Sequence, residues 1–313
     1  MKLVLYDDAL GAAGRRYQPG IWTDEGVVGI EAAVRDLPHW SPQDLMAAII
    51  DNFDGLRPEL ERLAISGTKL PLASVQLRPP LPRPGKILAC IGNYWEHMQR
   101  EARPLNMFLK SSDAVIGPGD TVVLPNFTEA YVFHHEAELA IVIKGPAKDV
   151  AAADYRKAVF GYTCMIDVSA RYEGRRTWRA GSWMGKSFDT FAPLGPCIVT
   201  ADEISDPNGL TVRFWNCAEL YHQYSTNDME HRVPELIAFA TNIMTMYSGD
   251  IISCGTNHEG LGPLQEGDLA EIEIQRIGRM AVNVKDPLKR TWERGVYMGP
   301  DSTNAAARAP RKS

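Results

Sequence analysis

Hydrophobic and polar residues alternate along much of the chain with the two-residue period of β-strands. Apolar runs bounded by Gly, Pro or Asp predict strands near the N-terminus at LVLY, GIWT and GVVGI, and further on at VVLP, AELAIVI, FGYTCMI and PCIVT. Polar and apolar residues also alternate on both sides of Ile277-Gly278-Arg279, in GDLAEIEIQRIGRMAVNVK, which predicts a half-buried hairpin.

Two segments have the longer period of helices. Ser41 is a typical capping residue and Pro42 suits the first helical position, so a helix is predicted over residues 41–66, with Gly55 as a candidate interruption. Apolar residues share one broad face of residues 234–247, which predicts a second helix. The pattern as a whole therefore predicts a mixed α/β fold that is mostly β.

A proline-rich stretch, RPPLPRPGK at residues 78–86, separates two parts of the chain. Proline fixes the backbone in extended form and removes donors, so this stretch is typical of a connector. We expect a small N-terminal α+β domain over residues 1–80 and a larger domain with the chemistry over residues 81–296. Residues 297–313 are expected to be a disordered tail.

Composition narrows the class of protein. The chain has 313 residues, of which 45% are hydrophobic and 23% charged, as expected of a globular protein with a sizeable core. The net charge of -6 argues against nucleic acid and anionic membranes as partners. No apolar run is long enough for a signal peptide or a membrane span. The five scattered cysteines contain no CxxC pair, which favours reduced thiols and a cytoplasmic location.

The sequence His134-His135-Glu136-Ala137-Glu138 opens the strand AELAIVI. Strand side chains face the same way every second residue, so Glu136 and Glu138 should project together. Two neighbouring carboxylates repel each other and are costly to desolvate, and a bound cation would relieve both costs. Oxygen ligands favour Mg²⁺ or Mn²⁺. The alternative is an exposed strand edge with two solvated glutamates.

Two later segments carry further charged groups. Asp167 follows the apolar run FGYTCMI and could either reach the rim of a pocket or cap a turn. Lys186 and Asp189 lie among Gly, Trp, Phe and Pro in WMGKSFDTFAPLGP, which indicates a tight loop near a site or a surface turn.

His97 and Glu101 form a third candidate. If residues 91–101 are helical, the two side chains share a face, and the carboxylate would make the histidine a better base. An ordinary surface salt link is the alternative.

Taken together and in this order, these segments resemble the fumarylacetoacetate hydrolase family. The resemblance covers residues 86–287, in the pieces GNYWEH, LKSSDAVIGPGD, HHEAELAIVI, GYTCMIDVSAR, WMGKSFDTFAPLGP and SGDIISCGTNHEGLGPLQEGD. It implies a rolled β-sandwich catalytic domain, a small N-terminal domain and a homodimer.

The resemblance also implies a metal site. The ligands of Mg²⁺ or Mn²⁺ would be Glu136, Glu138 and Asp167, and Lys186 would lie beside the metal and the substrate. His134 shares a face with Glu136 and could touch substrate or metal, which leaves zinc as an alternative.

For the substrate, the resemblance implies that Thr256 helps to hold a carboxylate and that Arg171 contributes to binding. His97 would be the histidine of a lid, with Glu101 as its partner, although the acid of related lids falls where this chain has Arg100. The turn Asn257-His258-Glu259 replaces a proline-containing turn that lines the pocket.

These residues imply hydrolysis of a carbon–carbon bond in an acylpyruvate-like 2,4-dioxo acid. The same metal site would also suit a decarboxylase or a tautomerase of a small 2-oxo acid, which need no water nucleophile. A metal-stabilised binding protein without turnover is the third alternative.

Overall fold

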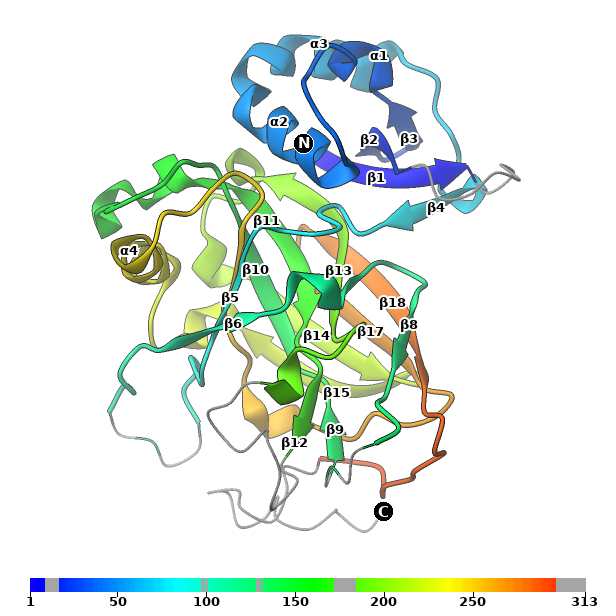
Figure 1. Cartoon of the computed structure of the whole chain (residues 1–313), viewed down its shortest axis with the longest axis vertical. Coiled ribbons are helices and arrows are strands. Elements are labelled where there is room, and N and C mark those ends of the chain that lie inside the picture. The colour runs from blue at the N-terminus through cyan, green and yellow to red at the C-terminus, as the bar shows by residue number, and fades with distance from the viewer. Residues whose placement is uncertain are drawn as a thin grey trace.

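The computed structural model describes residues 1–8, 17–96, 99, 101–127, 130, 132–171 and 184–296. In this part of the chain the strands form three sheets (Figure 1). The largest has eleven strands and runs β3 (Gly26–Gly29), β2 (Gln18–Thr23), β1 (Lys2–Asp8), β13 (Ala192–Thr200), β11 (Val159–Ile166), β10 (Ala137–Ile143), β16 (Ile251–Ser253), β5 (Ile87–Cys90), β6 (Met107–Lys110), with β4 (Val75–Arg78) on β1 and β7 (Val115–Ile116) on β13.

The other sheets are smaller. One has five strands in the order β15 (Glu219–Ser225), β14 (Thr211–Asn216), β17 (Leu269–Ile274), β18 (Gly278–Lys285), β8 (Thr121–Val123). The other pairs β12 (Ser169–Arg171) with β9 (Val132–His134). The helices are α1 (Glu31–Val34), α2 (Pro42–Asp51), α3 (Phe53–Ser66) and α4 (Val233–Ile243). The prediction of a mostly β fold is confirmed.

The strand predictions agree with these bounds, and the predicted hairpin is β17 and β18, paired antiparallel. Its reversal lies before the predicted centre, where Arg276 has a φ of 68° and Gly278 a φ of 131°. These left-handed conformations allow the chain to turn between Ile274 and Gly278, which face each other across the hairpin.

The predicted helices differ in their ends. Ser41 caps α2 as expected, since its hydroxyl accepts a hydrogen bond of 3.2 Å from the amide of Asp44. The helix breaks at Asn52 and not at Gly55, because the Asn52 side chain donates to the carbonyl of Ala48 and so competes with the helical backbone.

Helix α4 ends at Ile243, before the predicted end at residue 247. The chain leaves the helix because Met246 pairs with Ala147 in an antiparallel bridge, with N–H···O distances of 2.8 and 2.9 Å.

The eleven-stranded sheet has a hydrophobic core on each face. Side chains alternate along β10, so Leu139 and Ile141 pack against the five-stranded sheet, whereas Ala140 and Val142 share the second core with α2 and α3. Glu138 faces the same way as Ala140. Its carboxylate therefore lies on the face of the sheet that α2 and α3 cover further along β10.

The N-terminal part of the chain extends the main sheet. Strand β1 pairs with β13 through Lys2↔Val199 and Leu3↔Ile198, and the helices α1–α3 form a layer at one end of the molecule (Figure 1). Leu81, in the proline-rich connector, is buried in the same core. The division at residue 80 stays a prediction, and the expected tail at 297–313 lies outside the described residues.

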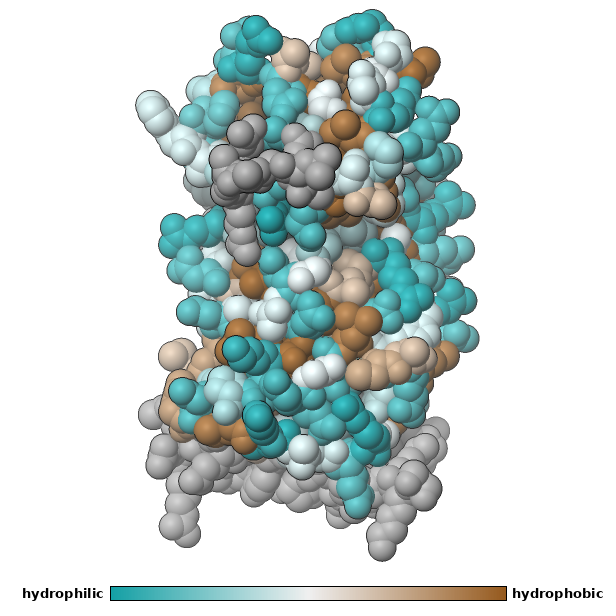
Figure 2. All heavy atoms as spheres, turned by 90° about the vertical axis from the view of Figure 1, so that its right-hand side faces the viewer, coloured by the Kyte–Doolittle hydropathy of each residue, from teal (hydrophilic) through white to brown (hydrophobic). Residues whose placement is uncertain are grey.

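One side of the molecular surface is mostly hydrophilic. Figure 2 shows the side of the molecule that carries β8 and β18, where hydrophilic side chains predominate and hydrophobic ones form small patches between them. None of the described helices is long and apolar enough to span a membrane.

The shared core predicts that the N-terminal helices and the main sheet unfold together. Ile49 in α2 is fully buried, so Ile49→Ala should lower the free energy of unfolding by about 2–5 kcal/mol in a single urea transition. Ile65→Ala, at an 81% exposed position, is the control and should change it by less than about 0.5 kcal/mol. A separate early transition in the Ile49 variant would show that the helices form an independent unit.

Candidate active site

Three buried carboxylates converge where β10 and β11 lie side by side. Glu136 directly precedes β10, Glu138 is its second residue, and Asp167 follows β11. The antiparallel pairing Ala137↔Ile166 brings the strand ends together, and the Asp167 amide donates to the Glu136 carbonyl at 2.8 Å. One oxygen of each carboxylate lies within 4.8 Å of the others, and we call these three residues the acidic cluster.

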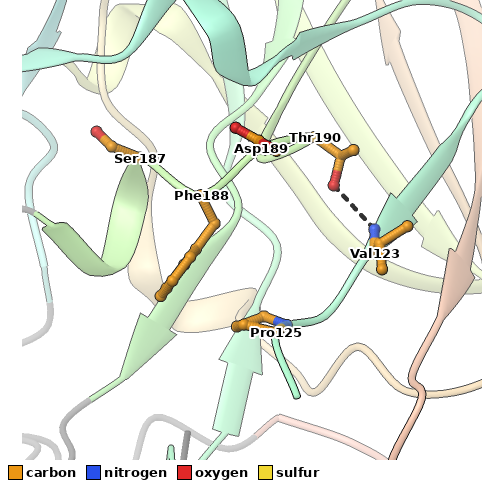
Figure 3. A pocket seen from close by; sticks show the side chains of 6 residues that line it. All are labelled: Val123, Pro125, Ser187, Phe188, Asp189 and Thr190. Carbon is orange, nitrogen blue, oxygen red and sulfur yellow. Dashed lines mark hydrogen bonds between the residues drawn. The ribbon is translucent and has the colours of Figure 1, made fainter. Parts of the chain in front are cut away.

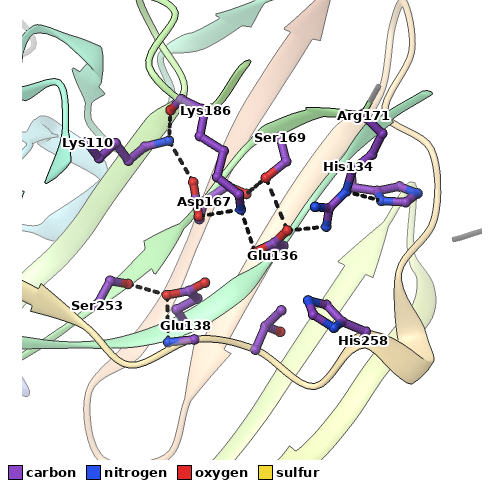
Figure 4. A network of polar contacts seen from close by, with 12 residues as sticks. Lys110, His134, Glu136, Glu138, Asp167, Ser169, Arg171, Lys186, Ser253 and His258 are labelled. Atoms are coloured by element: carbon purple, nitrogen blue, oxygen red, sulfur yellow. Dashed lines mark hydrogen bonds and ion pairs between the residues drawn. The ribbon is translucent and has the colours of Figure 1, made fainter. Parts of the chain in front are cut away.

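Two buried lysines neutralise part of this charge (Figure 4). Lys186 Nζ donates to Glu136 Oε2 at 2.8 Å and to Asp167 Oδ2 at 2.7 Å. Lys110 Nζ donates to Asp167 Oδ1 at 2.7 Å and also to the carbonyl of Lys186. Both lysines are therefore ion-paired inside the protein, and Lys110 fixes the backbone at Lys186.

Glu138 is held differently. Its Oε2 accepts hydrogen bonds from the Ser253 hydroxyl and, at 2.9 Å, from the Gly255 amide. Its Oε1 is buried and has no hydrogen-bond partner among the described residues. A buried carboxylate oxygen without a partner is costly, and a cation between the three carboxylates would satisfy it. The oxygen-only donor set fits a hard ion such as Mg²⁺ or Mn²⁺.

The pKa values of Glu136 and Glu138 are shifted in opposite directions. Burial raises the pKa of Glu138 to about 8, and the negative charges of Asp167 and Glu136 add to this effect. Burial acts in the same direction on Glu136, but the charges of Lys186 and Arg171 outweigh it and hold the pKa of Glu136 well below its usual value. A cation bound in the acidic cluster would therefore have to displace a proton from Glu138.

Arg171 and His134 lie on the neighbouring pair β9–β12 (Figure 4). Arg171 donates through Nη2 to Glu136 Oε1, and through Nε to His134 Nδ1 at 3.0 Å. Because that lone pair of His134 is already used, His134 Nδ1 is not a free metal ligand. The group of described residues that could hold an ion consists of carboxylates alone, which favours Mg²⁺ or Mn²⁺ over the zinc alternative.

The turn after β16 borders the acidic cluster. Thr256, next to Gly255, is 2% exposed, and its hydroxyl lies 3.4 Å from the hydroxyl of Tyr224. Two positions further on, His258 Nδ1 contacts Glu96 Oε1. The structure therefore places the predicted substrate residue Thr256 beside Glu138, and adds a histidine–carboxylate pair that the motifs did not indicate.

Of the predicted lid pair, His97 and Glu101, only Glu101 is among the described residues. His97 lies outside the described residues. Glu101 is exposed, and its carbonyl accepts from Gln99 Nε2 at 2.9 Å. The helix considered for residues 91–101 is wrong for the described residues, since Tyr94 instead pairs with Met229 in a β-bridge. The roles of His97 and Glu101 stay predictions.

Three residues that shape the acidic cluster were missed in the sequence, namely Lys110, Ser253 and Gly255. Lys110 ends the apolar strand β6 and is fully buried, and a charged residue at the end of an apolar run was the available signal. Ser253 and Gly255 come from another part of the chain and carry no local signal.

The loop after Lys186 lines a surface hollow of about 500 Å³ (Figure 3). Its walls are Val123, Pro125, Ser187, Phe188, Asp189 and Thr190. The Thr190 hydroxyl accepts a 2.8 Å hydrogen bond from the Val123 amide, and Thr190 has a φ of 72°. The loop is tight, and Asp189 lines the hollow at the surface, so both alternatives from the sequence, a loop near a site and a surface turn, stay open for Asp189.

The fold and the acidic cluster together define a metal-dependent enzyme built on a β-sandwich. Residues 86–285 match the family model described as fumarylacetoacetate (FAA) hydrolase C-terminal. The chain belongs to the fumarylacetoacetate hydrolase family, as the sequence motifs predicted.

Several members resemble the chain over most of its length. The maleylpyruvate hydrolase of Aquipseudomonas alcaligenes is 31% identical over 283 residues, which cover 85% of this chain and 96% of that protein. The human mitochondrial oxaloacetate tautomerase FAHD2A is 36% identical over 223 residues, 67% of this chain and 69% of that protein. A crystal structure of maleylpyruvate hydrolase from Sphingobium sp. SYK-6, in complex with manganese (II) ion and pyruvate, has a TM-score of 0.79 and 36% identity over 91% of this chain and 99% of that one.

The acidic cluster makes a direct prediction for metal binding. Glu138→Gln removes a charged ligand while keeping the side-chain shape, so calorimetry should show Mn²⁺ affinity falling by more than the roughly 10- to 100-fold that loss of an outer-shell partner costs. Glu219→Gln, on the exposed face of β15, is the matched control and should leave the affinity unchanged. Full Mn²⁺ affinity in the Glu138 variant would refute this ligand set.

The raised pKa of Glu138 predicts a pH dependence. Below about pH 8 the cation has to displace a proton, so Mn²⁺ affinity should fall by up to about tenfold for each pH unit and level off above that value. Titrations of Mn²⁺ binding between about pH 6 and pH 9 measure this. An affinity that does not change over this range would mean that Glu138 is ionised before the metal arrives.

Proposed function

We propose that the protein is a Mg²⁺- or Mn²⁺-dependent hydrolase that cleaves a carbon–carbon bond in an acylpyruvate-like 2,4-dioxo acid. The observation that carries the proposal is the buried acidic cluster with its unpaired Glu138 oxygen, beside Lys186. The similarity to maleylpyruvate hydrolases over most of the chain supports it.

In this proposal Glu136, Glu138 and Asp167 hold the cation. When bound, the cation supplies Lewis-acid stabilisation for the negative charge that builds up on the oxo acid. Lys186 and Arg171 add positive charge from the sides, and the Thr256 hydroxyl offers a hydrogen bond to the substrate carboxylate. His134 keeps Arg171 in place through the 3.0 Å contact with its Nε.

The chemistry requires a water molecule and two proton transfers. His97, oriented by Glu101, takes a proton from the water, whose oxygen adds to the distal ketone carbon. The bond between that carbon and the pyruvate unit breaks, and its electron pair forms a pyruvate enolate. A proton then has to be added to the enolate carbon, which gives pyruvate and a second carboxylic acid.

Tautomerisation of a 2-oxo acid is the second candidate, since FAHD2A, named an oxaloacetate tautomerase, is also similar to this chain. It needs the same enolate and the same proton transfer to carbon, without the water nucleophile. Decarboxylation needs the enolate alone and is the third possible outcome at this site.

Two further proposals concern the setting of the enzyme. We propose a homodimer, which two exposed apolar side chains support. Val123, 40% exposed, lines the hollow of Figure 3, and Phe127, 65% exposed, packs edge-on against Phe188 in the wall of the same hollow. The mass of the purified chain in light scattering tests this.

We also propose a cytoplasmic location, which the five free cysteines, four of them buried, support.

The reaction is tested with a panel of small 2-oxo and 2,4-dioxo acids, with product masses read in the presence of Mn²⁺ or EDTA. The proposal predicts pyruvate plus a second acid, formed with Mn²⁺ and absent with EDTA. An unchanged mass with enol–keto conversion would favour the tautomerase, and carbon dioxide the decarboxylase. Full turnover in EDTA would contradict any metal-dependent mechanism.

A further inference from the structure

His258 and Glu96 form a histidine–carboxylate pair to which the proposed mechanism gives no role. His258 Nδ1 contacts Glu96 Oε1, and the two residues are 162 positions apart in the sequence. Their side chains are 22% and 19% exposed, so the pair is partly shielded from water but remains reachable. A surface ion pair would have no such shielding.

The backbone on the Glu96 side is fixed by several contacts. The Trp95 amide donates to the Asp228 carbonyl at 3.1 Å, and Arg103 Nη1 lies 3.6 Å from Glu96 Oε1. Burial opposes ionisation of Glu96, but His258 and then Arg103 outweigh it and lower its pKa. Glu96 is therefore an ionised acceptor at neutral pH.

The turn that carries His258 is fixed as well. Asn257 caps it by accepting from the Glu259 amide at 2.8 Å. Gly260 packs so closely on β15 that an added Cβ would lie 1.9 Å from His222 Cδ2. The same turn begins at Gly255, whose amide holds Glu138, so His258 is tied to the acidic cluster through a short rigid segment.

His258 is directed toward the acidic cluster. Figure 4 shows its ring pointing from the turn toward the side of Glu136 and Arg171. A positive charge on His258 would lower the pKa of Glu136 further, after the larger effects of Lys186 and Arg171. His258 Nε2 has no hydrogen bond to any described residue, in contrast to Nδ1.

The pairing decides which nitrogen can react. An ionised Glu96 accepts the Nδ1 proton, so Nε2 is the nitrogen that gains and loses a proton. We propose that His258 is a second proton-transfer residue of this site, which exchanges a proton with carbon 3 of a bound 2-oxo acid, and that Glu96 is its positioning residue. The substrate class rests on the proposed function.

The step balances in both directions. After carbon–carbon cleavage, protonated His258 gives its Nε2 proton to carbon 3 of the pyruvate enolate, which yields pyruvate and neutral imidazole. In reverse, neutral Nε2 removes a proton from carbon 3 of pyruvate, and the enolate forms. In deuterated water the imidazolium proton exchanges with solvent, so the return step places deuterium on carbon 3.

Solvent exchange therefore tests the proposal without carbon–carbon cleavage. The holoenzyme with Mn²⁺ is incubated with pyruvate in D₂O, and loss of the methyl proton signal is followed by NMR. Mg²⁺ replaces Mn²⁺ where paramagnetic broadening interferes. His258→Gln should slow this exchange by roughly 100- to 10,000-fold, the usual contribution of a general acid–base, with Mn²⁺ affinity unchanged.

Two variants separate proton transfer from a structural role. His258→Ala should regain exchange when imidazole is added, which the loss of a packing contact would not allow. Glu96→Gln should slow the exchange less than His258→Gln, since it leaves the imidazole in place. His231→Gln is the matched control, because His231 is also 22% exposed with an acid, Glu235, 3.9 Å away; it should exchange like the wild type.

The possible outcomes are distinct. Wild-type exchange rates in His258→Gln, or no rescue of His258→Ala by imidazole, would overturn the role of His258 while cleavage by the wild type still supports the proposed function. A wild-type protein that binds Mn²⁺ but neither cleaves nor exchanges any acid of the panel would overturn the proposed function, and the role of His258 with it.

Discussion

The structure depends on burying three carboxylates within 4.8 Å of one another at the end of a hydrophobic sheet. Removing a charge from water costs several kcal/mol even after the protein relaxes, and like charges this close add to that cost. Lys110 and Lys186, both buried, offset part of it, but Glu138 keeps an unpaired oxygen and a raised pKa. The acidic cluster is therefore complete only with a cation, and the surrounding residues can be understood as its support.

The fold supplies this support from both sides of the sheet. Pairing of β10 with β11 and β16 sets the positions of Glu138, Asp167 and Ser253, while the five-stranded sheet holds one face of these strands in a dry core. The helices α2 and α3 cover the other face further along the same strands. Cores at native density resist displacement, so the carboxylates have little freedom to move apart.

Much of this could be predicted from the sequence, because it follows local rules. The alternation of polar and apolar residues predicted the strands. The two-residue period of a strand also predicted that Glu136 and Glu138 project on the same side. The motif order identified the family. The contacts of Lys110, of Ser253 and of the Glu96–His258 pair could not be predicted, since the two partners of each contact lie 57, 115 and 162 positions apart and only the fold brings them together. The break at Asn52 depends on a side chain competing for its own backbone, which periodicity does not reveal.

Membership of the fumarylacetoacetate hydrolase family and the acidic cluster make metal binding the central claim about this protein. The most direct measurement is anomalous diffraction at the manganese edge from crystals grown with Mn²⁺. The account predicts one strong peak at about 2.1–2.3 Å from oxygens of Glu136, Glu138 and Asp167, within the usual range for hard cations. A peak elsewhere, or an empty cluster at saturating Mn²⁺, would contradict it.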